Sequence, residues 1–179
     1  MNSLSQWVYR TATTRGTKRT LISVAGAVFW YGVVAAAIVL APLIDRWWGL
    51  HLSVPAIPRS VLSIFFLLVG VLLVGWTILR FFQAKGTPVP FNPPQKFVTD
   101  GLYNYVRNPM HLGWTFMLIG LGLAFASFTL LVIFTPGFFI IHFLYLRFIE
   151  EKELERKFGQ SYLDYKKRVP MFFPKIKRT

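Results

Sequence analysis

Two long stretches of this chain carry almost no charge, and they restrict the fold more than any other feature. Residues 21–44 are 24 consecutive residues without a charged side chain. Residues 112–149 are 38 residues, of which only Arg147 is charged. A bilayer core about 30 Å thick requires about 20 apolar residues of helix. The first stretch therefore predicts one membrane-spanning helix, and the second is long enough for two.

The pattern predicts an all-α integral membrane bundle of four transmembrane helices. Helices are expected because backbone groups in lipid must find their hydrogen bonds within a helix or a closed barrel. A tight turn near Phe125–Thr129 divides the second stretch, so the last two spans form a helical hairpin. Gly70, Gly75, Gly120 and Gly122 predict close helix packing. The spans are predicted at residues 21–44, 60–80, 111–127 and 129–149 of a single domain covering residues 1–179.

The composition agrees with a membrane protein and excludes several other classes. The chain is 54% hydrophobic, with a mean hydropathy of +0.49 and a net charge of +13. Its basic residues lie beside the apolar segments, which favours anionic lipid headgroups over nucleic acid as their counter-charge. The chain has no cysteine, so disulfides, thiolate metal sites and a cysteine nucleophile are excluded.

The distribution of Lys and Arg predicts the orientation. Four spans place both termini on the same side, together with the loop between the second and third spans. That side holds 18 of the 20 Lys and Arg residues, and only Arg46 and Arg59 lie opposite. By the positive-inside rule, both termini and a C-terminal helix are cytoplasmic. The sequence Asp45-Arg46-Trp47-Trp48 predicts an interface belt at the other membrane surface.

A compact polar turn precedes the third span, in the sequence Gly101–Gly113. The residue before a proline is biased out of helix, so Asn108-Pro109 predicts a break there. The freed backbone groups and the following helix start offer hydrogen-bond partners to a polar ligand. Arg107 can either hold a carboxylate or anchor the positive side of the membrane. Tyr103 and His111 also have plain structural interpretations, as an interface aromatic and a hydrogen-bonded residue at the helix start.

Most of the acidic residues follow the last span. Five of the seven are Glu150, Glu151, Glu153, Glu155 and Asp164. Arg147 precedes Glu150 and Glu151 by three and four residues, so the three side chains share a helix face. This block is either a salt-bridged helix leaving the membrane or a pair of carboxylates that bind a ligand. His142, inside the last span, predicts a structural hydrogen bond. No metal-ligand spacing, Ser-His-Asp arrangement or phosphate-binding glycine loop occurs.

Taken together, the two polar blocks resemble the isoprenylcysteine carboxyl methyltransferase family. That family lies within a wider group of small membrane methyltransferases that includes phospholipid N-methyltransferases. The resemblance covers roughly Gly86–Pro174, about half of the chain, and the first two spans match only in character. The matching positions are Phe97–Tyr103, Val106–His111, Gly113, Glu150-Glu151, Phe158-Gly159, Tyr162, Tyr165 and Arg168-Val-Pro170.

The resemblance implies a methyltransferase that uses S-adenosylmethionine, with a cofactor pocket at the cytoplasmic face formed by residues 86–111 and 147–174. Arg147 and Glu151 then lie where the polar head of a lipid-like substrate enters, with Arg107 as a third catalytic candidate. Glu150 closes the cofactor pocket. The other residues implied to line the cofactor are Phe97, Val98, Tyr103, Asn108, Pro109, Met110 and His111.

The chain departs from the family's Arg-His-Pro-x-Tyr sequence at two positions. Asn108 replaces the histidine and keeps a polar side chain. His111 replaces the tyrosine, and must supply an equivalent donor if the tyrosine hydroxyl contacts the cofactor. A metal site is not implied.

The methyl acceptor stays open at this point. The nearest family analogue is a prenylated cysteine carboxylate, which is already ionised and needs no base. A phospholipid amine would need proton removal, for which Glu151 or His111 is the candidate. The competing class is a non-enzymatic membrane protein whose charged tail binds anionic lipid or a partner.

Overall fold

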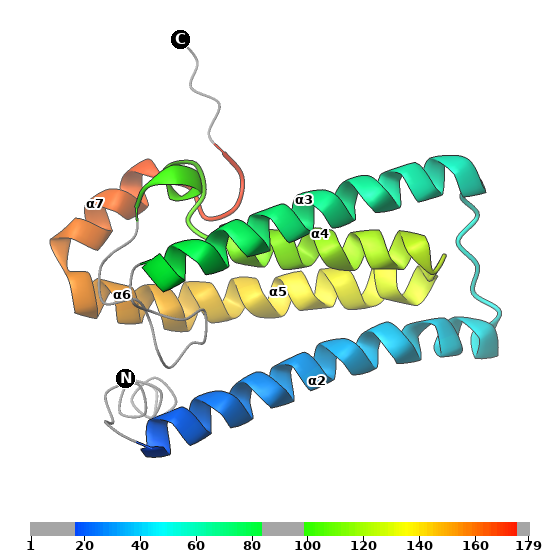
Figure 1. Cartoon of the computed structure of the whole chain (residues 1–179), viewed down its shortest axis with the longest axis horizontal. Coiled ribbons are helices and arrows are strands. Elements are labelled where there is room, and N and C mark those ends of the chain that lie inside the picture. Colours follow the sequence, from blue (N-terminus) through cyan, green and yellow to red (C-terminus); the bar gives the residue numbers. More distant parts are fainter. Residues whose placement is uncertain (1–16, 84–98, 175–179) are drawn as a thin grey trace, which may run out of the picture. The chain divides into compact units, whose positions relative to one another are not determined.

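The computed structural model describes residues 17–83 and 99–174, and every regular element in those ranges is helical (Figure 1). The all-α prediction is therefore confirmed for the described residues. Phe97 and Val98, two of the predicted cofactor residues, lie outside them. The elements are α2 (Thr17–Trp48), α3 (Ala56–Gln83), the 3-10 helix η1 (Gly101–Asn104), α4 (Pro109–Ala124), the π-helix η2 (Thr129–Phe134), α5 (Thr135–Tyr145), the π-helix η3 (Leu146–Glu150), α6 (Glu151–Phe158) and α7 (Gln160–Arg168).

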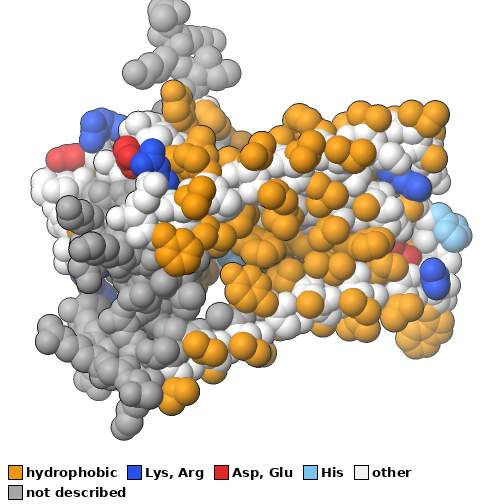
Figure 2. Space-filling view, viewed as in Figure 1, with side chains coloured by type: hydrophobic (Ala, Val, Ile, Leu, Met, Phe, Trp, Pro, Cys, Tyr) orange, Lys and Arg blue, Asp and Glu red, His pale blue; other side chains and the backbone are white. Residues whose placement is uncertain are grey.

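Within residues 17–83 and 99–174, three helical segments are long and apolar enough to cross a membrane, which makes this a multi-pass membrane protein. They are Val28–Trp48, Ala56–Gln83 and Thr129–Phe158. Large apolar side chains such as those of Phe29 and Leu72 are exposed along them, and hydrophobic side chains dominate the visible surface along α2 and α3 (Figure 2). The predicted third span corresponds to α4, which has only 16 residues. A helix of that length covers about 24 Å, so the count of four spans stays a prediction.

The described contacts divide the chain into two compact units. Unit 1 contains residues 17–30, 77–83, 99–109 and 144–174, and unit 2 contains residues 31–76 and 110–143. The single-domain prediction is not tested by this division.

In unit 2, glycines allow α3 and α4 to pack backbone to backbone. A Cβ atom on Gly70 would lie 2.8 Å from the carbonyl oxygen of Gly113 and 2.9 Å from the backbone nitrogen of Met117. A Cβ on Gly120 would lie 3.0 Å from the nitrogen of Leu67. The Ser63 hydroxyl donates a 2.8 Å hydrogen bond to the Gly120 carbonyl in the same contact. The predicted packing role is therefore confirmed for Gly70 and Gly120, whereas it is wrong for Gly75, whose Cβ would meet nothing within 4 Å.

This difference gives a test of the α3–α4 contact. Gly70→Ala is expected to destabilise the protein by about 2 kcal/mol, because its methyl group collides with two backbone atoms that cannot rotate away. Gly75→Ala adds the same methyl group in open space and is expected to be neutral or slightly stabilising. The thermal unfolding midpoints of both variants in detergent would be compared with that of the parent. If both variants lowered the unfolding midpoint equally, helix propensity and not close packing would determine the effect of these substitutions on stability.

The turn predicted near Phe125–Thr129 is present in unit 2 and is held by an acidic side chain from α2. Asp45 is buried, although its sequence context predicted an interface position. Its carboxylate accepts a 2.5 Å hydrogen bond from the Ser127 hydroxyl, a 2.9 Å bond from the Thr129 backbone N–H and a bond from the Thr129 hydroxyl. Because Thr129 begins η2, Asp45 satisfies donors at the start of this helical stretch. Trp47 and Trp48 are exposed, as expected for an interface belt.

Candidate functional site

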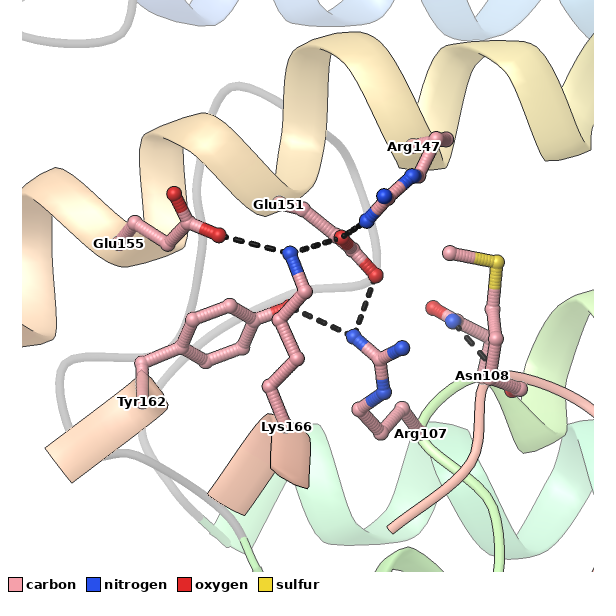
Figure 3. A network of polar contacts seen from close by, with 8 residues as sticks. Arg107, Asn108, Arg147, Glu151, Glu155, Tyr162 and Lys166 are labelled. Carbon is pink, nitrogen blue, oxygen red and sulfur yellow. Dashed lines mark hydrogen bonds and ion pairs between the residues drawn. The ribbon is translucent and has the colours of Figure 1, made fainter. Parts of the chain in front are cut away.

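Unit 1 brings together three residues that the sequence marked as catalytic candidates. The Arg107 guanidinium forms a hydrogen-bonded ion pair with the Glu151 carboxylate, 44 residues later in the chain (Figure 3). The side chains are buried, with 10% of Arg107 and 4% of Glu151 exposed. Arg147 donates a 3.0 Å hydrogen bond to the other Glu151 oxygen across one helical turn. Arg147 is half exposed, so it forms the outer edge of the cluster.

The C-terminal helix α7 adds two further residues to this cluster. The Lys166 ammonium lies 2.5 Å from Glu151 Oε2 and 2.8 Å from Glu155 Oε1 (Figure 3). Burial alone would lower the pKa of Lys166, but the hydrogen bonds to the two carboxylates outweigh it and raise that pKa. The Tyr162 hydroxyl oxygen accepts a 3.3 Å hydrogen bond from Arg107. Burial, and next the charge of Glu151, raises the pKa of Tyr162 to about 12, so the phenol stays protonated.

The local sequence explains how these side chains come to face one another. Glu151 begins α6 directly after the π-helical turn η3. Gly159 then ends α6 with φ of 56° and ψ of −132°, a conformation that residues with a Cβ rarely adopt. The chain changes direction there, and α7 follows. Tyr162 and Lys166 are four residues apart on α7, so both project from the same face of that helix.

The segment after α7 returns to the Arg-Asn-Pro turn. The backbone N–H of Arg107 donates a 2.9 Å hydrogen bond to the Pro170 carbonyl, and that of Asn108 donates a 3.1 Å bond to the Met171 carbonyl. The Tyr165 hydroxyl donates a 2.7 Å bond to the Tyr103 carbonyl. Sequence reasoning expected the freed backbone groups at this turn to bind a ligand. Two of the N–H groups are instead satisfied by the C-terminal segment.

The remaining predicted site residues fall in both units. Tyr103 is buried in η1 of unit 1, and its pKa is raised by burial and then by the charge of Glu150. Pro109 is fully buried and begins α4. Glu150 is half-buried and, within the described residues, its carboxylate forms no hydrogen bond or ion pair. Arg107 also has an unused group, because its buried Nε has no hydrogen-bond partner in the described part of the chain.

Met110 and His111 belong to unit 2, in the first turn of α4. The His111 ring lies 5.0 Å from that of His142, centroid to centroid. His142 Nδ1 lies 2.8 Å from the Phe138 carbonyl, and since a carbonyl can only accept, Nδ1 carries the proton. The predicted structural hydrogen bond of His142 is therefore confirmed. Within residues 17–83 and 99–174, no group of three His, Asp or Glu side chains could hold a metal ion.

Sequence reasoning missed Lys166 and the contact between Tyr162 and Arg107. Tyr162 belongs to the matching positions of the family pattern, but that pattern assigns it no role. The available signal was the four-residue spacing of Tyr162 and Lys166 after a glycine. That spacing alone does not identify the buried carboxylate to which the helix face turns.

The helical fold and the buried cluster of charges define a multi-pass membrane protein with a polar site in its C-terminal half. Comparison with known proteins identifies the family. The phospholipid methyltransferase family matches residues 58–161, more than half of the chain. This chain belongs to that family.

Curated relatives carry two kinds of name. Methanethiol S-methyltransferase of Crocosphaera subtropica is 35% identical over 89 residues, covering 46% of this chain and 31% of the relative. Protein-S-isoprenylcysteine O-methyltransferase of Xenopus laevis is 39% identical over 82 residues, covering 45% of this chain and 27% of the relative. Methanethiol S-methyltransferase of Pseudomonas deceptionensis is 27% identical over 162 residues, covering 82% of this chain and 59% of the relative. The matches thus span only part of the length of each relative.

The fold is also similar to a solved structure, that of the eukaryotic intramembrane Ras methyltransferase, an isoprenylcysteine carboxyl methyltransferase. The TM-score is 0.57 at 21% identity, covering 81% of this chain and 52% of the solved chain. At this level of identity, the similarity supports the fold alone.

Proposed function

We propose that this protein is an S-adenosylmethionine-dependent methyltransferase that acts on a lipid-like acceptor at the cytoplasmic face of the membrane. The observation that carries the proposal is the buried Arg107–Glu151 ion pair, which joins the two sequence blocks of the family pattern. Family membership and the names of the relatives support methyl transfer. The excess of Lys and Arg in the terminal and middle segments supports the cytoplasmic placement.

The residues of unit 1 fit the donor end of this cofactor, which carries an ammonium group, a carboxylate and a sulfonium. The buried Arg107 Nε is a donor without a partner in the described residues, suited to a carboxylate. The Glu150 carboxylate forms no hydrogen bond or ion pair within the described residues, so it is an acceptor suited to an ammonium group. Tyr103, Asn108 and Pro109 would complete the cofactor site. In the same proposal Phe97, Val98, Met110 and His111 contribute to it as well.

When bound, S-adenosylmethionine supplies an electrophilic methyl group, and its displacement depends mainly on alignment and exclusion of water. Arg147 is suited to orient an anionic acceptor, because it is half exposed and already fixed by one bond to Glu151. A prenylated cysteine carboxylate, as in the relatives named for isoprenylcysteine, would be held in this way and needs no base.

A phospholipid amine is the second candidate acceptor, and it requires a base. Glu151 is a poor choice, because both of its oxygens are bonded to cations that stabilise the ionised form. His111 is the remaining candidate, since its imidazole forms no hydrogen bond within the described residues. The two acceptors would be distinguished by the pH dependence of the rate. An amine should react faster as the pH rises through neutrality, whereas a carboxylate should show little change.

Calorimetry with S-adenosylhomocysteine on the purified protein tests the proposal. We expect binding by the parent, and at least about tenfold weaker binding by Glu150→Gln, which corresponds to about 1.4 kcal/mol. Glu155→Gln is the matched control. It removes a nearby carboxylate that, among the described residues, pairs only with Lys166. A flat titration with folded parent protein would exclude the enzymatic function. If Glu150→Gln and Glu155→Gln lost the same binding affinity, Glu150 would not belong to the cofactor site.

A further inference from the structure

Two adjacent lysines of α7 have different surroundings. Lys167 is 73% exposed and pairs with Asp164 on its own helix, at 3.4 Å. Lys166 is only 24% exposed, and its ammonium lies 2.5 Å from Glu151 Oε2 and 2.8 Å from Glu155 Oε1 (Figure 3). Since Glu151 and Glu155 are one helical turn apart on α6, a single ammonium can bridge them. Lys166 is therefore part of the buried cluster, whereas Lys167 belongs to the surface.

Lys166 and Arg147 share one oxygen of the Glu151 carboxylate. Arg107 bonds to Oε1, whereas Oε2 accepts both from Lys166 and from Arg147, which donates through Nη1 at 3.0 Å. A carboxylate oxygen accepts about two hydrogen bonds, so Oε2 is fully used while Lys166 is present. An arginine that has a carboxylate to itself frequently binds it through two nitrogens. Arg147 uses one nitrogen here, in its single hydrogen bond within the described residues.

The orientation of the half-exposed Arg147 side chain depends on this shared oxygen. If the Lys166 charge were removed, Arg147 would be the one cation left at Oε2 among the described residues. The attraction between Arg147 and Glu151 would then be stronger, and the guanidinium would be drawn onto the carboxylate. A lysine that only fastened α7 to α6 would have the opposite effect, because its loss would loosen α7 and expose Arg147 further.

We propose that Lys166 is a positioning residue, which occupies Glu151 and thereby keeps the outer part of the Arg147 guanidinium available to an anionic methyl acceptor. The inference rests on the proposed function for the identity of that acceptor. The dependence of Arg147 on Lys166 can be measured without any methyl transfer, because it follows from the contacts of Glu151 alone.

Modification by phenylglyoxal measures how available the Arg147 guanidinium is. The reagent attacks the deprotonated guanidine, so closer pairing with a carboxylate slows the reaction. Mass spectrometry of the digested protein would give the modification rate of Arg147 in detergent. Lys166→Gln is expected to slow that rate roughly threefold, which is the size typical of an exposed ion pair. Lys166→Arg should restore the parent rate, and the matched control Lys167→Gln should leave it unchanged.

Glu155→Gln gives a second test, with the opposite sign. It removes the other carboxylate that Lys166 contacts, so Lys166 should bind Glu151 more closely and Arg147 should react faster. Because Glu155 is one-third exposed, this variant keeps the inference falsifiable if Lys166→Gln does not fold. An unchanged or faster reaction of Arg147 in Lys166→Gln would overturn the inference. An unchanged or slower reaction in Glu155→Gln would do the same.

Calorimetry with S-adenosylhomocysteine on the parent protein separates this inference from the proposed function. The expected modification rates together with a flat titration would support the role of Lys166 in placing Arg147 and exclude the enzymatic function. Binding of S-adenosylhomocysteine without any effect of Lys166 on Arg147 would retain the function and overturn the inference. In turnover with N-acetyl-S-farnesylcysteine, Lys166→Gln should raise the KM for this carboxylate roughly threefold and leave the KM for S-adenosylmethionine unchanged. A change in the KM for S-adenosylmethionine alone would contradict a role at the acceptor.

Discussion

Glu151→Gln is expected to destabilise the protein by about 3 kcal/mol, because it leaves a buried guanidinium without its counter-charge. Arg107 is 90% buried and, among the described residues, its other bond at this point is the one to the neutral Tyr162 hydroxyl. Lys166 keeps Glu155, and Arg147 can turn toward solvent because half of it is exposed. The destabilisation therefore comes mainly from the unpaired guanidinium of Arg107. The same change should abolish binding of S-adenosylhomocysteine, since Arg107 would no longer be held in place.

Thermal unfolding in detergent, followed by tryptophan fluorescence, measures the stability effect. Glu155→Gln is the control, because Glu155 is one-third exposed and contacts only Lys166 among the described residues. The double variant Arg107→Gln/Glu151→Gln should be more stable than the sum of the two single losses predicts, because it removes the unpaired charge. If the stability losses of the two single variants simply added up in the double variant, the two side chains would not form a coupled pair in the protein.

Asp45→Ala is expected to have a similarly large effect in unit 2, again about 3 kcal/mol, although it changes no residue of the candidate site. The substitution removes the acceptor for the Thr129 backbone N–H and for the hydroxyls of Ser127 and Thr129. All three residues are buried, so water cannot easily replace the carboxylate. Asp164→Ala, at an exposed carboxylate, is the control and should change the unfolding midpoint little. A small decrease in the unfolding midpoint of Asp45→Ala would indicate that water enters and satisfies these donors.

The sequence was sufficient to predict the features that depend on local pattern. Uncharged runs located α2, α3 and the stretch that begins at Thr129, because lipid requires long apolar helices whatever their neighbours are. The break at Asn108-Pro109 followed from proline sterics. The bond between Arg147 and Glu151 followed from helical spacing. Each of these requires only residues that are close together in the chain.

The features that sequence reasoning missed depend on residues that are far apart in the chain. Asp45 was interpreted as part of an interface belt, because nothing near it indicates that Ser127 and Thr129 would surround its carboxylate. Gly70 and Gly75 are equivalent by pattern, but only Gly70 faces α4. The backbone donors at Arg107 and Asn108 looked available to a ligand until the residues after α7 were placed against them. Tertiary packing decides each of these cases.

The paired residues of the Arg107–Glu151 cluster lie far apart in the chain, so translation produces them at different times. Arg107 is made before its partners Glu151 and Tyr162, which follow 44 and 55 residues later. During translation, the apolar helices can therefore enter the bilayer while the guanidinium is still unpaired. The cluster is complete only after α7, which carries Tyr162 and Lys166, has been synthesised. Nascent chains interrupted before that stage would be inserted without the Arg107–Glu151 pair. Membrane integration and completion of the charged cluster are therefore separate events in the synthesis of this protein.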